Sequence, residues 1–113
     1  MDAHWKIWLE HEGRPFFGDG RARLVEAIRD EGSLTAAAAH VGMSYRKAWE
    51  RVNQMERIYG ARLIDRQTGG RRGGGCSLTE EGVRLLDAYR EFREAMERRF
   101  VEEFEEFQRR LDG

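Results

Sequence analysis

The stretch GSLTAAAAHVGMSYRKAWE, residues 32–50, decides the fold of this chain. Its four consecutive alanines, residues 36–39, favour a helix and leave no bulk, so another helix can approach closely. Gly42 predicts a turn, and Ser44 is placed to cap a helix that continues to about Tyr59. Two helices joined by a short turn containing glycine predict a helix-turn-helix. Taken alone, such a pair of helices is also common in proteins that do not bind DNA.

The second helix of this pair is expected to have two different faces. Helical spacing places four apolar residues on the buried side: Ala48, Val52, Met55 and Tyr59. Long donors and acceptors gather on the other side: Arg46, Lys47, Glu50, Asn53, Gln54 and Arg57. A recognition helix presents such side chains to base edges, whereas an ordinary amphipathic helix only exposes them to solvent. Trp49 lies between the two faces, and we expect it to pack in the core or at a hinge.

A glycine-rich segment follows, TGGRRGGG at residues 68–75, between two apolar stretches. Residues 61–67 predict a strand and residues 76–78 a return strand, so a wing is expected over about 61–79. Glycines permit positive φ angles and a close approach of the backbone to phosphate. Arg71 and Arg72 supply charge that could reach the duplex backbone or a minor groove. Paired arginines between strands argue against a flexible linker, and the absence of a Gly-Lys-Ser/Thr ending argues against a nucleotide-binding loop.

The region before residue 32 predicts a short hairpin followed by a helix. Residues 5–10 and 14–17 are rich in strand formers, with Pro15 tolerable on an edge strand. Asp19 is expected to cap a helix that runs to about Glu31 and stops at Gly32. Ser33 then begins the short alanine-rich helix.

Beyond residue 79, the chain predicts one long helix that begins at Thr79 and ends near Leu111. Its apolar residues recur every three or four positions: Leu85, Tyr89, Phe92, Met96, Phe100, Phe104, Phe107 and Leu111. The preceding part of the chain is too small to cover a stripe this long. We therefore expect a two-fold homodimer, with these residues at the interface, although the first two turns could pack on their own domain. The expected units are a DNA-binding domain, residues 1–82, and a dimerisation helix, residues 83–113.

Composition and charge limit the classes of function that this chain can have. The net charge is −1, but residues 44–75 carry eight Lys/Arg against three Asp/Glu, while both flanks are acidic. A basic island of this kind suits a polyanion, although charge runs are often only solvated faces. The residues show no acid–base pair, no Ser/His/Asp set and no metal-ligand spacing, so we expect neither an enzyme nor a cofactor. The single cysteine, Cys76, allows no intrachain disulfide, and the chain has no signal-like or membrane-spanning apolar run, which favours a cytoplasmic protein.

Several motifs together resemble one family. Ser-Tyr-x-x-Ala-Trp at residues 44–49 and Thr-Gly-Gly-x-x-Gly-Gly-Gly at residues 68–75 are similar to the N-terminal domain of ModE-type molybdate-responsive repressors. Gly-Ser-x-Thr at residues 32–35 and Leu-Thr-x-x-Gly at residues 78–82 belong to a frame shared with LysR-type regulators. The resemblance covers roughly residues 20–90. It implies a mainly helical fold with small β hairpins, a winged helix-turn-helix, and a dimeric repressor that reads a palindromic operator.

The motifs and the resemblance give a set of candidate DNA contacts: Ser33, Thr35, Ser44, Tyr45, Arg46, Lys47, Glu50, Asn53, Thr68, Arg71 and Arg72. Of these, Tyr45 could contact either the DNA backbone or the core. ModE proteins usually continue into molybdate-binding domains, and this sequence ends at Gly113, so we do not expect this chain to bind molybdate directly. Either the regulator uses no such ligand, or a separate effector-sensing protein supplies it. The alternative function is an adaptor that binds a protein partner rather than DNA.

Overall fold

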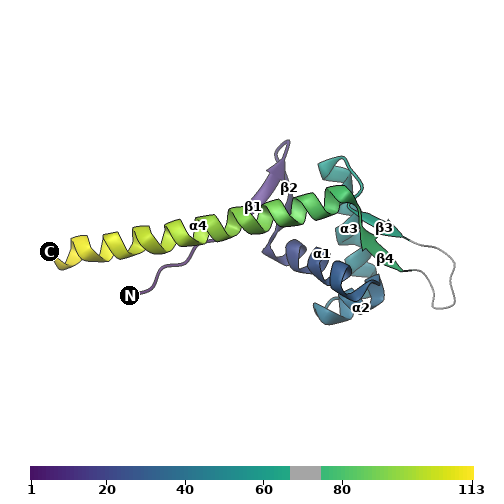
Figure 1. Ribbon diagram of the computed structural model, residues 1–113, viewed down its shortest axis with the longest axis horizontal. Coiled ribbons are helices and arrows are strands. Elements are labelled where there is room, and N and C mark those ends of the chain that lie inside the picture. The colour runs from purple at the N-terminus through teal and green to yellow at the C-terminus, as the bar shows by residue number, and fades with distance from the viewer. Residues whose placement is uncertain (67–74) are drawn as a thin grey trace.

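The computed structural model describes residues 1–66 and 75–113. It is mainly helical with two small antiparallel hairpins, as predicted, and α4 projects far beyond the head that the other elements form (Figure 1). The elements are β1 (Trp8–His11), β2 (Arg14–Gly18), α1 (Asp19–Glu31), α2 (Leu34–His40), α3 (Tyr45–Tyr59), β3 (Ile64–Arg66), β4 (Cys76–Leu78) and α4 (Glu80–Asp112).

Of the four helices in the described part of the chain, three start at the caps that the sequence predicts. The hydroxyl of Ser33 accepts a hydrogen bond from the Ala36 amide, and that of Ser44 accepts one from the Lys47 amide, both at 3.1 Å. Thr79 caps α4 in the same way, at 3.0 Å from the Gly82 amide. Each side chain satisfies an amide that would otherwise lack a partner in the first turn.

The predicted cap of α1 is wrong by one residue. Gly18 occupies the N-cap position, and Asp19 is the first residue of the helix. The Asp19 carboxylate instead accepts hydrogen bonds from the hydroxyl of Tyr89 and from Nε of Arg93, both on α4. A carboxylate held by two donors of another helix is not available to cap its own.

The first hairpin is shorter than predicted, because β1 begins at Trp8 rather than near Trp5. Glu12 and Gly13, with φ angles of 49° and 79°, connect β1 to β2. Two consecutive left-handed residues suit a two-residue hairpin turn. Pro15 lies opposite Glu10, and in a two-stranded sheet every strand is an edge that tolerates it.

The core of the head lies between α1, α2, α3 and the first turns of α4. Ala37 and Ala48 are fully buried, which confirms that small residues let α2 and α3 approach closely. Ile58 is buried, whereas Tyr59, which the sequence placed on the buried side of α3, is only half-buried. The last buried residue of this helix is therefore Ile58. A Cβ at Gly82 would lie 2.2 Å from the carbonyl oxygen of Leu63, so glycine lets α4 cross this backbone.

The strand expected over residues 61–67 is reduced to β3. Residues before it turn toward α3, because the Leu63 and Ile64 amides donate to the Glu56 carboxylate at 2.8 and 3.1 Å. β3 pairs with β4 from Ile64 opposite Leu78 to Arg66 opposite Cys76. The Cys76 amide also donates to the Gly32 carbonyl at 2.8 Å, which ties β4 to the end of α1.

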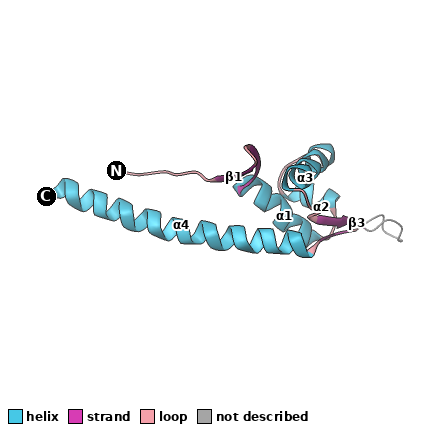
Figure 2. Cartoon of the chain, turned by 90° about the horizontal axis from the view of Figure 1, so that it is seen from above, coloured by secondary structure: helices cyan, strands magenta, loops and turns pink. Residues whose placement is uncertain are grey.

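Residues 1–7 form an extended N-terminal arm that runs beside the outer half of α4 (Figure 2). The Trp5 indole donates to Glu97 at 2.8 Å, and its ring lies 5.9 Å from that of Phe100. The guanidinium of Arg93 lies 5.2 Å from the same indole ring. Trp5 is therefore bound to α4 and does not belong to the hairpin that the sequence predicts for it.

The apolar stripe of α4 divides into two parts. Tyr89, at 2% exposure, is buried against Phe17 of the head, so it cannot line a dimer interface as predicted. Leu85 also packs on the core. Farther out, four members of the stripe are exposed: Phe92, Met96, Phe107 and Leu111. Phe100 and Phe104 are half-buried and line a shallow hollow with the N-terminal arm.

Candidate nucleic-acid interface

The first three turns of α3 present the residues that the sequence predicts for base contact. Arg46, Lys47, Glu50 and Asn53 are all exposed, on the side of α3 opposite its buried residues. Tyr45 is 51% exposed, so the structure places it at the surface and not in the core. The Ser44 cap fixes where this face begins, and the helix N-terminus adds amides suited to a phosphate.

Arg46 and Glu50 form an ion pair across one helical turn, at 3.4 Å. Both side chains are strongly exposed, and a pair in solvent contributes little to stability. The ion pair therefore restricts the conformations of these two side chains only weakly. Either partner can exchange this contact for a base edge at small cost.

The Asn53 side chain accepts a hydrogen bond from a residue of the first wing strand. Nη2 of Arg66, the last residue of β3, donates to the Asn53 side-chain oxygen at 3.1 Å, and its guanidinium lies 3.1 Å above the centre of the Trp49 ring. Trp49 is half-buried and packs on the core, as predicted. Arg66 was not among the predicted contacts, because its partners lie thirteen and more residues away along the chain; its place at the end of a predicted wing strand was the available signal.

The opposite side of α3 is joined to α1. Nη2 of Arg21 donates to the Gln54 side-chain oxygen at 2.7 Å. Arg51 lies on the same side of α3. The burial of Arg21 lowers its pKa, and the nearby positive charge of Arg51 lowers it further. Arg21 and Arg51 were not among the predicted contacts, since only the packing of α1 beside α3 brings them together.

The remaining predicted contacts lie at the start of α2 and in the wing. Thr35 is exposed, and Ser33 is half-buried with its oxygen engaged as the helix cap. Thr68, Arg71 and Arg72 lie outside the described residues. The described ends of the wing, Arg66 and Gly75, adjoin α3 and the α1–α2 turn respectively.

Within residues 1–66 and 75–113, no three His, Cys, Asp or Glu side chains are grouped as a metal site would require. None of the described helices has the length and apolar character needed to cross a membrane. The described residues present an exposed polar face on α3 and, next to it, the start of the expected wing.

Residues 20–83 match the family model for bacterial regulatory helix-turn-helix proteins of the lysR family. The chain belongs to this family. The matched segment contains α1, α2, α3, both wing strands and the first turn of α4. This lysR-family chain therefore carries the helix-turn-helix unit of a bacterial regulatory protein.

The curated relatives to which this chain is similar in sequence include ModE proteins. It is 42% identical over 84 residues to the molybdenum transport protein ModE of Azotobacter vinelandii, which covers 71% of this chain and 31% of that protein. It is 35% identical over 89 residues to the DNA-binding transcriptional dual regulator ModE of Escherichia coli K12, covering 79% and 34%. The chain is thus a homologue of the N-terminal region of ModE and spans about a third of the length of these relatives.

Solved structures confirm the fold. The CbnR DNA-binding domain, solved in complex with DNA, superposes with a TM-score of 0.55 at 23% identity, over 71% of this chain and 87% of that one. The BenM DNA-binding domain, solved with benA site 1 DNA, gives 0.56 at 20% identity, over 74% and 89%. The winged helix-turn-helix predicted from the sequence is therefore confirmed.

Proposed function

We propose that this chain forms a homodimer that binds a palindromic operator and represses transcription. The observation that carries the proposal is the exposed polar face of α3, which presents the side chains of Arg46, Lys47, Glu50 and Asn53 to solvent. A helix with this face, preceded by a closely packed α2, is suited to the major groove. Such a regulator would act in the cytoplasm, together with the DNA that it controls.

The side-chain chemistry assigns a role to each position on α3. Arg46 and Lys47 donate to the O6 and N7 acceptors of guanine, and Glu50 accepts from the amino group of cytosine. Ser44 and Tyr45, at the start of the helix, contact the DNA backbone together with Ser33 and Thr35 of α2. Thr68, Arg71 and Arg72 contact flanking phosphates; this role rests on their residue types alone.

Asn53 has a narrower role than its residue type suggests. Bidentate reading of adenine needs both the amide oxygen and the amide nitrogen of asparagine. Arg66 already donates to that oxygen and takes one of its two acceptor positions, so the amide nitrogen is the group better placed to contact DNA. We expect Asn53 to donate to guanine or thymine acceptors rather than to select adenine.

The homodimer is supported by the exposed part of α4. Phe92, Met96, Phe107 and Leu111 lie on one side of the helix, and no other described part of the chain covers them. The same stripe on a second copy is a self-complementary partner, which a two-fold axis brings into contact. A dimer with this axis places two copies of α3 on two half-sites, and the operator then shares its symmetry.

The direct test is a gel-shift titration against the DNA upstream of the chain's own gene, at two salt concentrations. Wild-type protein should bind with a strong salt dependence, because bound phosphates release counterions. Arg71→Ala/Arg72→Ala should weaken binding to every sequence and flatten the salt slope by about two units, one per lost phosphate contact. Arg109→Ala/Arg110→Ala, at the far end of α4, is the control with an equal loss of charge.

An unchanged slope in the wing variant would remove Arg71 and Arg72 from the DNA interface. No salt-sensitive binding by the wild type at micromolar concentration would contradict the proposed operator binding and favour an adaptor for another protein. A reporter fused to a bound promoter then tests repression: deletion of the gene should raise expression, and a fall would indicate activation.

A further inference from the structure

A groove with a mixed lining lies where the N-terminus of α1 meets the first hairpin and α3. Its volume is 640 Å³, and we call it the α1 groove. Apolar side chains from three elements form one part of its wall, among them Trp8, Phe17 and Met43. Four cations form another part: Lys6, Arg21, Arg23 and Arg51. The lining is therefore amphipathic, with an excess of positive charge.

The only acid among the described residues of the lining is already neutralised. Asp19 accepts hydrogen bonds from Tyr89 and Arg93, which come from α4 on its other side. Those donors outweigh the effect of burial, which opposes ionisation, and lower the pKa of Asp19. Asp19 is thus engaged away from the four cations, whose charge remains uncompensated in the groove.

Arg21 shows the lack of a partner most clearly. Its Nη2 donates to Gln54, but its Nε is buried and has no hydrogen-bond partner within residues 1–66 and 75–113. The charge of Arg51 repels it, and burial adds to this effect in lowering its pKa. A buried donor without an acceptor is costly, and so is a pair of like charges. An anion beside the two guanidinium groups would offset the repulsion between their charges.

The N-terminus of α1 adds further donors at the same place. Gly18 occupies the N-cap, and no described side chain accepts a hydrogen bond from the first amides of this 13-residue helix. Gly18, Asp19 and Gly20 all line the groove. Free amides at a helix N-terminus attract negative charge.

We propose that the α1 groove binds a small carboxylate with an apolar body, such as a medium-chain fatty acid or an aryl acid. The carboxylate faces Arg21, Arg51 and the start of α1, and the apolar body covers Trp8, Pro15 and Met43. A phosphate of DNA has the charge but nothing to cover the apolar wall, so a small amphipathic acid fits the lining better. The proposal does not depend on the operator or the dimer proposed above.

The test is an NMR titration of the ¹⁵N-labelled full chain with octanoate in phosphate-free buffer. The reporters are the Gly20 amide, the Arg21 Nε–H and the Trp8 indole N–H. We expect saturable shifts at these three, with 1-octanol and inorganic phosphate each binding at least about tenfold more weakly, since each lacks one half of the interaction. 1-Octanol has the same chain length without the charge, and phosphate has the charge without the chain.

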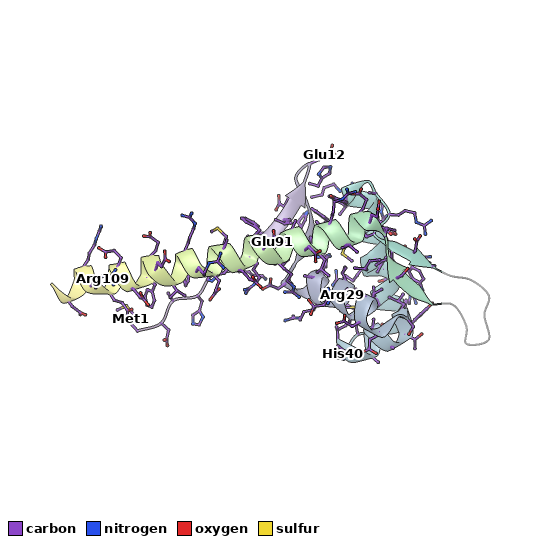
Figure 3. The ribbon with its side chains drawn as sticks, in the orientation of Figure 1. Met1, Glu12, Arg29, His40, Glu91 and Arg109 are labelled. Atoms are coloured by element: carbon purple, nitrogen blue, oxygen red, sulfur yellow. The ribbon has the colours of Figure 1, made fainter. Side chains whose placement is uncertain are left out.

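Variants locate the binding. Arg21→Gln should weaken octanoate about tenfold, as expected for the loss of a charge-assisted hydrogen bond. Arg51→Gln gives a second measurement if Arg21→Gln does not fold. Arg29→Gln is the matched control, since Arg29 lies on the same helix outside the groove, paired with Asp30 (Figure 3).

Four results would overturn the proposal. The first is the absence of saturable octanoate shifts, and the second is equal binding of 1-octanol, which would leave only an apolar surface. The third is equal binding of phosphate, which would make the groove a contact for the DNA backbone. The fourth is an equal loss of octanoate binding in the Arg29 and Arg21 variants.

Discussion

Helices α3 and α4 are both amphipathic, yet they leave opposite faces free. On the apolar side of α3, Ala48, Val52, Met55 and Ile58 are buried in the head, and the exposed side of this helix carries hydrogen-bonding groups. The outer half of α4 instead exposes apolar side chains among polar ones (Figure 3). Exposed donors and acceptors suit a polar partner, whereas an exposed apolar stripe suits another apolar surface. This contrast separates the part of the molecule that we propose contacts DNA from the part that we propose contacts a second copy.

The contrast also runs along α4 itself, and the largest effect should appear where α4 enters the core. Leu86→Ala should lower the free energy of unfolding by about 2–5 kcal/mol, because Leu86 is 1% exposed and its removal leaves a cavity. Val83→Ala, one turn earlier on the exposed side, should change it by less than about 0.5 kcal/mol. Urea denaturation of both variants measures the difference; similar losses would mean that the inner turns do not pack as described.

The outer half of α4 should respond in assembly rather than in folding. Phe92→Glu/Phe107→Glu places charge on the exposed stripe, so we expect at least a tenfold weaker dimer, about 1.4 kcal/mol or more. Glu94→Ala/Arg98→Ala, on exposed polar positions of the same helix, should leave the dimer unchanged. Sedimentation equilibrium measures both. A wild-type particle that stays at the 13.2 kDa of one chain would contradict the dimer itself.

On α3, the contact between Arg66 and Asn53 should affect sequence preference. Arg66→Ala frees the Asn53 oxygen, and we expect discrimination against adenine at the contacted base to fall by about 1–3 kcal/mol. Competition binding with operators that differ only at that base measures this change. Arg62→Ala, at an exposed position before β3, is the control. An unchanged preference with uniformly weaker binding would show that Arg66 contacts phosphate instead.

The smallest effect concerns the polar link between α1 and α4. Burial opposes ionisation of Asp19, but hydrogen bonds from Tyr89 and Arg93 lower its pKa below the ordinary value. The stability from this link is therefore present above the unfolded pKa of about 4 and is lost as pH falls through the folded value. Asp19→Asn should cost about 1 kcal/mol at neutral pH, a value reduced by partial exposure, and less at pH 3.

At alkaline pH the same link predicts the opposite trend. Burial, together with the Asp19 hydrogen bond and charge, raises the pKa of Tyr89 to about 12. Its contribution is present below pH 10 and is lost as pH rises toward 12. Thermal melts of wild type and Tyr89→Phe across this range measure it. A difference that does not change with pH would contradict the link.

Local features of the fold could be predicted from the sequence. The caps at Ser33, Ser44 and Thr79, the glycine end of α1 and the alanine contact of α2 with α3 depend on residues a few positions apart. The exposed polar side of α3 followed from helical periodicity. Neighbouring residues set the geometry of these features, so the sequence was sufficient to predict them, and the structure confirms them.

Contacts between distant residues could not be predicted in the same way. Trp5 is bound to Glu97 across 92 positions, and Asp19 to Tyr89 across 70. Nothing in the spacing of either segment indicates its partner, so the cap at Asp19 and the dimer role of Tyr89 were wrong. The division of the chain at residues 82 and 83 stays a prediction, as do the contacts from residues 67–74.

The most direct measurement of the central claim is selection of bound sequences from a random pool of duplex DNA by the purified chain. We predict two half-sites related by a dyad, with centres about 10 base pairs or a multiple of this apart, and loss of the preferred bases with Arg46→Ala/Lys47→Ala. A pool that stays random, or one that the α3 variant enriches as the wild type does, would contradict the account of α3 as the helix that reads DNA.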